Sequence, residues 1–237
     1  MSKGISRRGL LKTGAGVGGG LAMASFAGAF GLKEAHASHN SEDSVQTIVD
    51  LAATAETLAA TSYYFTILNN PLDFDDAAML YLKYALSSEL YHLSFLQSAG
   101  GKQLATKFYV PEKFLSDKGT NIATFIAAET AFTGAYLAAT RRFAELGNPR
   151  LAATTAQHAA TEAEHLALTR QIGGLLPNPN ALPAPIYYNV SDALPTLAPF
   201  LTGGPGFVGP VDFPGADAIN RLIGVEAVKV PVFLNVF

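Results

Sequence analysis

Apolar residues recur at helical spacing in four consecutive segments of the chain, each bounded by residues that end helices. The pattern predicts helices over about 43–68, 75–98, 120–146 and 150–172. Proline cannot continue a helix, and glycine commonly follows the last turn, so these residue types mark the ends. The breaks are Asn69-Asn70-Pro71, Gly100-Gly101, Gly147-Asn148-Pro149 and Gly173-Gly174.

The connections between the four predicted helices are short, long and short. A short connection places consecutive helices antiparallel, whereas the long one over residues 99–118 lets the third helix start at the opposite end of the bundle. We therefore expect an all-α fold over residues 38–174, a four-helix bundle with one long crossover.

The composition changes after the fourth predicted helix. Ten of the 13 prolines lie between Pro177 and Pro231, and helical periodicity disappears apart from a short stretch near 217–228. Residues 175–237 are therefore predicted to form a proline-rich, irregular C-terminal extension. Its apolar, β-branched end, residues 228–237, either packs on its own bundle or makes a subunit contact, and we favour packing on the bundle.

The N-terminus has the features of an export signal. Residues 6–12 read Ser-Arg-Arg-Gly-Leu-Leu-Lys and resemble the twin-arginine motif, and a Gly/Ala-rich run follows over 13–31. Ala35-His36-Ala37 fits a small-x-small cleavage site. We predict a twin-arginine signal peptide over 1–37, export to the periplasm or the extracellular space, and no stable membrane insertion after cleavage. A retained anchor is the alternative, but a spanning helix needs roughly 20 strongly apolar residues.

Composition narrows the classes of function. The 237 residues are 49% hydrophobic and 15% charged, which suits one medium-sized globular domain with an extension. The net charge of −3 provides no basic surface for nucleic acid. Cysteine is absent, which excludes disulfides, iron–sulfur clusters, cysteine-ligated zinc and lipidated cysteine.

A set of polar residues repeats along the predicted helices at a fixed offset of 73, the difference between 129 and 56, 162 and 89, and 165 and 92. Each repeat is a helix with one glutamate followed by a helix with Glu-x-x-His. Tyr63 and Tyr136 keep the same offset. The repeated residues are Glu56, Glu89 and His92 in the first unit, and Glu129, Glu162 and His165 in the second.

This repeated set has the composition of a metal site. Residues i and i+3 share one face of a helix, so the glutamate and histidine of each Glu-x-x-His can bind one ion. The four glutamates lie in apolar stripes without lysine or arginine, and unpaired buried charge is costly. Two divalent cations would neutralise four carboxylates, and proton sharing is the metal-free alternative. Oxygen and imidazole ligands suit Fe or Mn and accept Zn.

Each Glu-x-x-His alone is a common pattern on solvated helix faces and is weak evidence for metal. Two such pairs and two further glutamates, all repeated at the same offset and all on the apolar face of their helices, together favour a metal site over a solvated face. We therefore predict a dinuclear site made of all six residues, with two divalent metal ions, Fe first and Mn second.

These motifs resemble those of the ferritin-like superfamily, which includes ferritins, bacterioferritins and rubrerythrins. The resemblance covers about residues 43–172, and the export signal and proline-rich tail are most similar to the exported ferritin-like group that contains desiccation-related proteins. It implies that Glu56, Glu89 and His92 serve one metal and that Glu129, Glu162 and His165 serve the other. It also implies that Glu89 and Glu162 bridge. The missing cysteines disfavour a rubrerythrin, and the tail and signal disfavour an iron-storage cage.

The resemblance implies redox chemistry with metal ions and O2 or peroxide as partners, either as a ferroxidase or in peroxide and oxidative-stress protection. A manganese-catalase-like peroxide dismutase is one alternative. A non-enzymatic stress or desiccation protein, in which metal only stabilises the bundle, is the other. A homo-oligomer is compatible with each of these.

Six further residues lie near the ligand candidates in the sequence pattern or carry charge. We expect His158, four residues before Glu162, to support the site or fill the core, since the equivalent position in the first unit is Ala85. Tyr63 and Tyr136 are expected to be core aromatics with satisfied hydroxyls, with ligand hydrogen bonding or electron transfer as alternatives. The remaining charged candidates are expected on the surface, and they are Glu164, Arg141 and Arg142.

Overall fold

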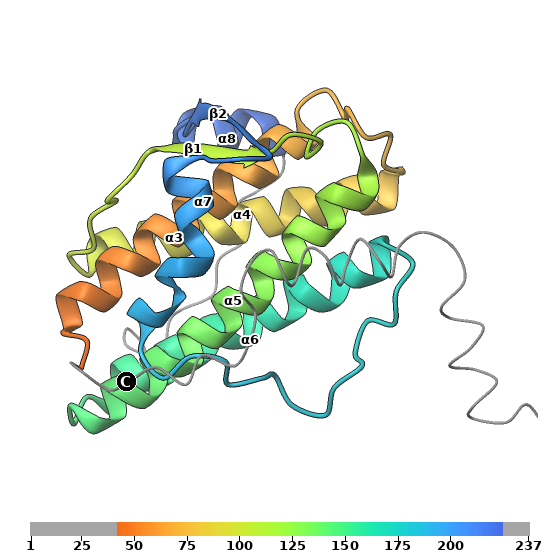
Figure 1. Cartoon of the computed structure of the whole chain (residues 1–237). Helices are drawn as coiled ribbons and strands as arrows, with labels where there is room; N and C mark the ends of the chain where they lie inside the picture. The colour runs from red at the N-terminus through yellow and green to blue at the C-terminus, as the bar shows by residue number, and fades with distance from the viewer. Residues whose placement is uncertain (1–41, 225–237) are drawn as a thin grey trace, which may run out of the picture.

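A computed structural model of the chain describes residues 42–224, and this part is mostly helical (Figure 1). The predicted signal peptide, residues 1–37, and the apolar end, residues 228–237, lie outside the described residues, so both predictions remain predictions.

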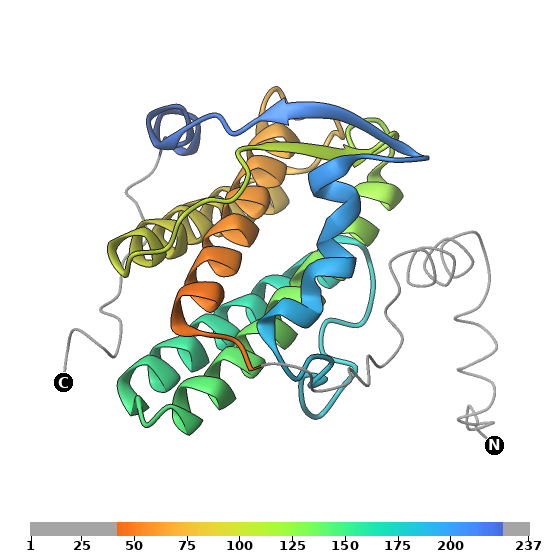
Figure 2. The ribbon, with the colours of Figure 1, turned by 60° about the vertical axis from the view of Figure 1, so that its left-hand side comes forward.

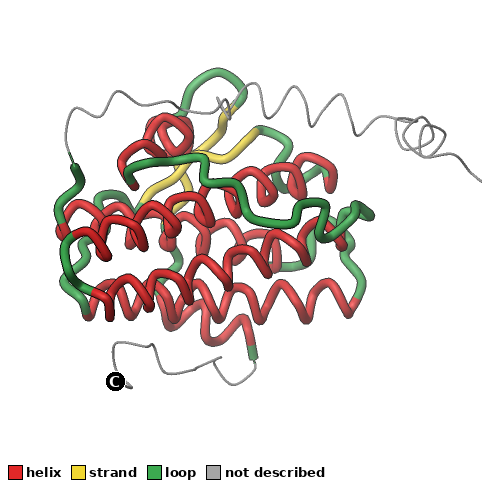
Figure 3. The backbone as a smooth tube through the Cα atoms, turned by 90° about the horizontal axis from the view of Figure 1, so that it is seen from below, coloured by secondary structure: helices red, strands yellow, loops and turns green. Residues whose placement is uncertain are grey.

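Four long helices occupy the segments that the periodicity predicted. Each lies within three residues of its expected ends, and the short connections leave consecutive helices packed as pairs, α3 beside α4 and α5 beside α6 (Figures 1 and 3). The helices are α3 (Val45–Ile67), α4 (Asp76–Ser98), α5 (Lys118–Glu145) and α6 (Pro149–Ile172).

Local sequence accounts for the helix starts. A side-chain oxygen caps each N-terminus by accepting a hydrogen bond from a backbone N–H of the first turn, which otherwise has no partner. The capping residues are Ser44, Asp75, Asp117 and Asn148. Pro149 occupies the first turn of α6, where its missing N–H costs nothing.

The mostly helical structure agrees with the all-α expectation, but a small sheet that the sequence did not predict lies on one side of the helices. β1 (Lys107–Pro111), within the long connection, pairs antiparallel with β2 (Phe207–Asp212) (Figure 1). Each strand has at most six residues, and Gly209-Pro210 inside β2 reads as a strand breaker. Their pairing joins segments about a hundred residues apart, which a local pattern does not encode.

The described part of the C-terminal extension is more regular than predicted. It contains η1 (Val190–Ala193), α7 (Leu194–Thr202), β2 and α8 (Ala216–Ile223). Only α8 was anticipated. α7 was not predicted because it contains two prolines, although one of them lies in the first turn, where proline is tolerated.

Specific contacts attach this extension to the helices. The Arg141 guanidinium lies 3.6 Å from the ring centroid of Tyr188, and its Nη2 donates to the Tyr188 carbonyl oxygen at 2.9 Å. Asp43 accepts a hydrogen bond from the Ser191 amide at 2.9 Å. Arg141 also pairs with Glu42 and Glu145, so the predicted surface position is correct only in part. It also anchors the extension.

Among the described helices, α5 alone is long and apolar enough to cross a membrane. Its most apolar window is 78% buried against the rest of the chain, which identifies α5 as the core helix of the fold.

Candidate metal centre

The six predicted ligand residues meet in the interior, one or two from each long helix. Their side chains are buried, with relative exposures of at most 6%. α3 contributes Glu56, α4 contributes Glu89 and His92, α5 contributes Glu129, and α6 contributes Glu162 and His165.

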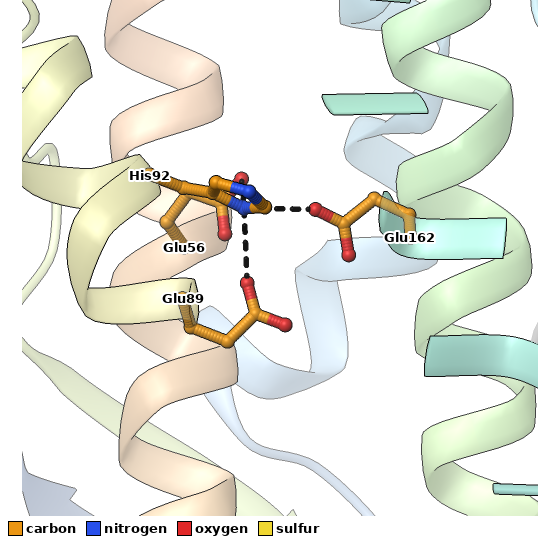
Figure 4. A group of neighbouring side chains, drawn as sticks. All are labelled: Glu56, Glu89, His92 and Glu162. Atoms are coloured by element: carbon orange, nitrogen blue, oxygen red, sulfur yellow. Dashed lines mark ion pairs between the residues drawn. The ribbon is translucent and has the colours of Figure 1, made fainter. Parts of the chain in front are cut away.

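One group of four forms around His92. Its Nδ1 lies 3.1 Å from Oε1 of Glu162, 3.5 Å from Oε2 of Glu89 and 3.6 Å from Oε1 of Glu56. Figure 4 shows Glu162 reaching from α6 toward the side chains of α3 and α4. Ligand-type atoms of all four residues lie within 4.8 Å of one another.

A second group forms around His165 with the same geometry. Its Nδ1 lies 2.8 Å from Oε1 of Glu89, 3.3 Å from Oε2 of Glu162 and 3.9 Å from Oε2 of Glu129. Glu89 and Glu162 belong to both groups, with one oxygen of each facing either histidine. The two groups therefore share two carboxylates, one from α4 and one from α6.

Two tyrosines connect the repeats crosswise. Tyr63 on α3 donates its hydroxyl to Oε1 of Glu129 on α5 at 2.7 Å, and Tyr136 on α5 donates to Oε1 of Glu56 on α3. Both hydroxyls are buried and hydrogen-bonded as expected, but they bond the ligand candidates, which was the alternative to a role as core aromatics alone. Glu129 thus has one oxygen held by a tyrosine and the other facing His165, whereas Oε1 of Glu56 both accepts from Tyr136 and lies 3.6 Å from Nδ1 of His92.

Most of the buried ligand-type atoms in the two groups lack hydrogen-bond partners. They are Oε2 of Glu56 and of Glu129, both carboxylate oxygens of Glu89 and of Glu162, and Nδ1 of His92 and of His165. The close approaches between histidine and carboxylate are short enough for ion pairs, but they lack hydrogen-bond geometry. Buried polar atoms are costly without partners. These oxygens and imidazole nitrogens are the donor types that divalent Fe or Mn binds, so the residues fit such ions.

The protonation of the carboxylates depends on how many histidines each one faces. Burial and the neighbouring Glu162 and Glu89 raise the pKa of Glu56 and of Glu129 well above the usual range. Burial also opposes charge on Glu89, but His165 and His92 outweigh it and lower the pKa of that carboxyl.

Glu162 behaves like Glu89. Burial and the charge of Glu89 oppose its ionisation, but contacts with both histidines lower its pKa. Burial disfavours charge on His92 and His165 as well, yet the surrounding carboxylates raise the pKa of both imidazoles. Without metal, the directions of these shifts favour imidazolium at both histidines beside ionised Glu89 and Glu162, and protonated Glu56 and Glu129.

His158 belongs to neither group. It is buried, its Nδ1 lies 2.8 Å from the Thr154 carbonyl oxygen, and its ring centroid lies 4.5 Å from that of His92 and 4.9 Å from that of Tyr136. Burial and the neighbouring His92 lower the pKa of His158 to about 4, so its ring is neutral. His158 therefore supports the side chains of the first group, as the sequence predicted.

Sequence reasoning missed Tyr81 on α4. Its hydroxyl donates to the backbone oxygen of His165 at 3.1 Å, and burial raises its pKa to about 12. The available signal was its position two helical turns before Glu89, on the same face. Glu164, by contrast, is exposed as expected and lies outside both groups.

The arrangement brings together two overlapping clusters of carboxylate and imidazole in a buried, apolar interior. No protein-family model, curated protein or solved structure matches the chain, so the description of this centre rests on its sequence and geometry.

Proposed function

We propose that the four long helices form a ferritin-like bundle that binds two divalent metal ions, Fe first and Mn as the alternative. Glu56, Glu89 and His92 would hold one ion, and Glu129, Glu162 and His165 would hold the other. Glu89 and Glu162 would bridge. The proposal extends to export by the twin-arginine route and to membership of the exported, desiccation-related group, which the N-terminal motif supports.

The observation that carries the proposal is the set of unpartnered buried atoms. Each candidate ligand in the two groups has a buried oxygen or Nδ1 that lacks a hydrogen bond, and in the two bridging candidates both oxygens lack one. A fully deprotonated set would hold four negative charges, which two divalent ions neutralise. A protein interior favours such compensation over uncompensated charge.

The proposed chemistry is oxidation of Fe(II) by dioxygen or peroxide, or removal of peroxide. When bound, a pair of such ions supplies two electrons, which together with two protons reduce dioxygen to hydrogen peroxide, or hydrogen peroxide to two waters. Glu89 and Glu162 fix the spacing of the two sites, and Tyr63 and Tyr136 orient the lone glutamates. The apolar residues around them exclude bulk water, which strengthens electrostatic interactions inside the site.

A non-enzymatic role is the second candidate, and the pKa pattern favours it. Two imidazolium ions can neutralise Glu89 and Glu162, and two protonated glutamates complete a metal-free interior. In that case the chain is a stress or desiccation protein whose buried cluster only stabilises the helices. A manganese-catalase-like dismutase would use the same donor types as the leading candidate. Rapid oxygen release from peroxide by the Mn-loaded protein distinguishes it.

The first test is elemental analysis of the mature protein purified without added metal. We expect about two Fe or Mn ions per chain and their loss in the Glu89→Ala/Glu162→Ala double variant. Glu164→Ala is the matched control, because it removes an exposed glutamate from the same helix, and it should keep both ions.

Circular dichroism of each variant separates loss of metal from loss of fold, and Glu89→Gln/Glu162→Gln replaces the alanine pair if that pair unfolds. A folded wild-type protein that takes up neither Fe(II) nor Mn(II) would refute the metal proposal and leave the structural role.

A further inference from the structure

The α3–α4 pair and the α5–α6 pair meet along the boundary between α3 and α5, which we call the seam. These helices make few direct contacts with each other, and η1 and α7 lie across the seam (Figures 1 and 2). Buried Leu197 and Phe200 of α7 pack in one cluster with Leu58 of α3 and Phe132 of α5. The C-terminal extension therefore covers the face of the bundle where two of its helices separate.

A cavity of about 30 Å³ lies in this seam. Apolar side chains line it almost entirely, including Ala55 of α3, Ala135 of α5 and Leu197 of α7. Leu194, which is 40% exposed, borders its outer side. On its inner side lies Tyr136, whose hydroxyl donates to Glu56. The cavity thus reaches from near the surface to a side chain that holds a candidate ligand.

A second cavity, of about 10 Å³, continues along the same seam. Phe132 lines both cavities and lies between them. Glu129 itself lines the second cavity, together with Leu58 and Phe200. Residues of α3, α5 and α7 line both cavities, and the first reaches Tyr136, which bonds Glu56, while the second reaches Glu129 itself.

The lining determines what kind of molecule fits. The outer cavity is lined by alanine, valine, isoleucine, leucine and aromatic side chains, and such a space stays dry and admits small apolar molecules such as xenon. The second cavity adds Ser62, Thr124 and Glu129 to its apolar lining. A polar molecule that enters the outer cavity loses its hydrogen bonds to water and gains almost none in return, which is unfavourable. Dioxygen is small and apolar, whereas hydrogen peroxide is strongly hydrogen-bonded in water. The seam should therefore admit the first and not the second.

We propose that the seam between α3 and α5, under α7, is the route by which dioxygen reaches the buried centre. The inference rests on the proposed function, and it names dioxygen as the oxidant that this route serves. Small side chains at Ala55 and Ala135 keep the passage open, and Phe132 separates its outer part from its inner part.

The first experiment is independent of metal. Crystals of the full chain under xenon pressure should show xenon in the outer cavity, because xenon occupies dry apolar spaces. Ala135→Leu fills that space and should abolish the xenon site. Ala156→Leu, an equal enlargement at an exposed position of α6, should leave it unchanged. Absence of xenon in the wild type, or its persistence in Ala135→Leu, would overturn the proposal.

The second experiment measures the oxidation of loaded Fe(II) by stopped flow. Ala135→Leu should lower the second-order rate with dioxygen about tenfold, which corresponds to a barrier raised by about 1.4 kcal/mol. The rate with hydrogen peroxide should stay within about twofold of the wild type, since peroxide does not use the route. Ala55→Val narrows the passage from the opposite helix and replaces Ala135→Leu if that variant misfolds.

Equal slowing with both oxidants, or no slowing with dioxygen, at normal metal content overturns the passage alone. A chain that binds no metal by elemental analysis overturns the proposed function and the passage with it, so the two failures are distinguishable.

Discussion

The α3–α4 half and the α5–α6 half present the same ligand types to the centre, but their surroundings differ. Near His92, the His158 ring lies tilted against the His92 ring at a centroid distance of 4.5 Å, and the Tyr136 ring stacks on the His158 ring at 4.9 Å. Near His165, the Tyr81 hydroxyl bonds the backbone, and the Tyr63 ring lies edge-on at 6.2 Å. Ala85 stands in α4 where α6 has His158.

The difference separates two kinds of constraint. Neutralising buried charge requires a matched set of carboxylates and imidazoles, so the same set of three central residues, two glutamates and one histidine, occurs in each half. Filling the space behind them requires only volume and satisfied polar groups, which several residue combinations can provide. The surroundings were therefore free to diverge while the centre kept its symmetry.

The largest expected effect is on metal content, and it should differ between a glutamate that belongs to both groups and one that belongs to a single group. Glu89→Gln should remove both ions, because this carboxylate faces both histidines, whereas Glu56→Gln should remove about one of the two. Elemental analysis after dialysis measures the ratio of metal to chain. Equal losses in the two variants would contradict the shared position of Glu89.

The number of protons released when metal binds tests how the centre is protonated in the metal-free protein. The raised pKa values of His92, His165, Glu56 and Glu129 mean that these groups hold protons in the metal-free protein, and metal must displace them. Two ions should therefore release about four protons, and affinity should rise with pH, by about a hundredfold per unit for each ion.

The pH window follows from the directions of the shifts. Protons on Glu56, Glu129 and both histidines compete with metal at every pH below their raised pKa values, which lie above the ordinary 4.5 of a glutamate and 6.5 of a histidine. The dependence ends once the raised pKa values are passed. Calorimetry in buffers of different ionisation enthalpy counts the protons, and an affinity that is independent of pH would show that the ligands are already deprotonated.

Replacing Tyr63 or Tyr136 should weaken the metal ion bound by the other repeat. Tyr63→Phe frees Glu129, and Tyr136→Phe frees Glu56, because each hydroxyl donates to the glutamate of the other repeat. Each change should weaken one ion about tenfold, the lower end of the range for residues that orient metal ligands. Stepwise metal titration measures this, and the double variant should weaken both ions. Weakening of both ions by either single change would contradict the crosswise assignment.

The smallest expected effect concerns the asymmetric His158. His158→Phe keeps an aromatic ring against His92 but removes the contact of its Nδ1 with the Thr154 carbonyl oxygen. One of the two ions should weaken only about threefold, since His158 makes no hydrogen bond to a ligand. The same titration checks it. A complete loss of that ion would mean that His158 is itself a ligand.

The sequence by itself determined the helices and the list of central residues. Helical spacing and capping residues such as Ser44 and Asp75 act within a few positions, so they can be read locally. A glutamate inside an apolar stripe, repeated at the same offset, indicates a buried charge that requires compensation. That the compensation is metal remains a prediction.

The tertiary structure alone decided which distant groups meet. β1 pairs with β2, Arg141 holds Tyr188, α7 covers the seam, and Tyr63 bonds Glu129 rather than the glutamate of its own helix. These partners are tens of residues apart, and several pairings would satisfy the same local pattern. Close packing of the whole chain selects one of them, because only one arrangement fills the interior and satisfies its polar atoms together.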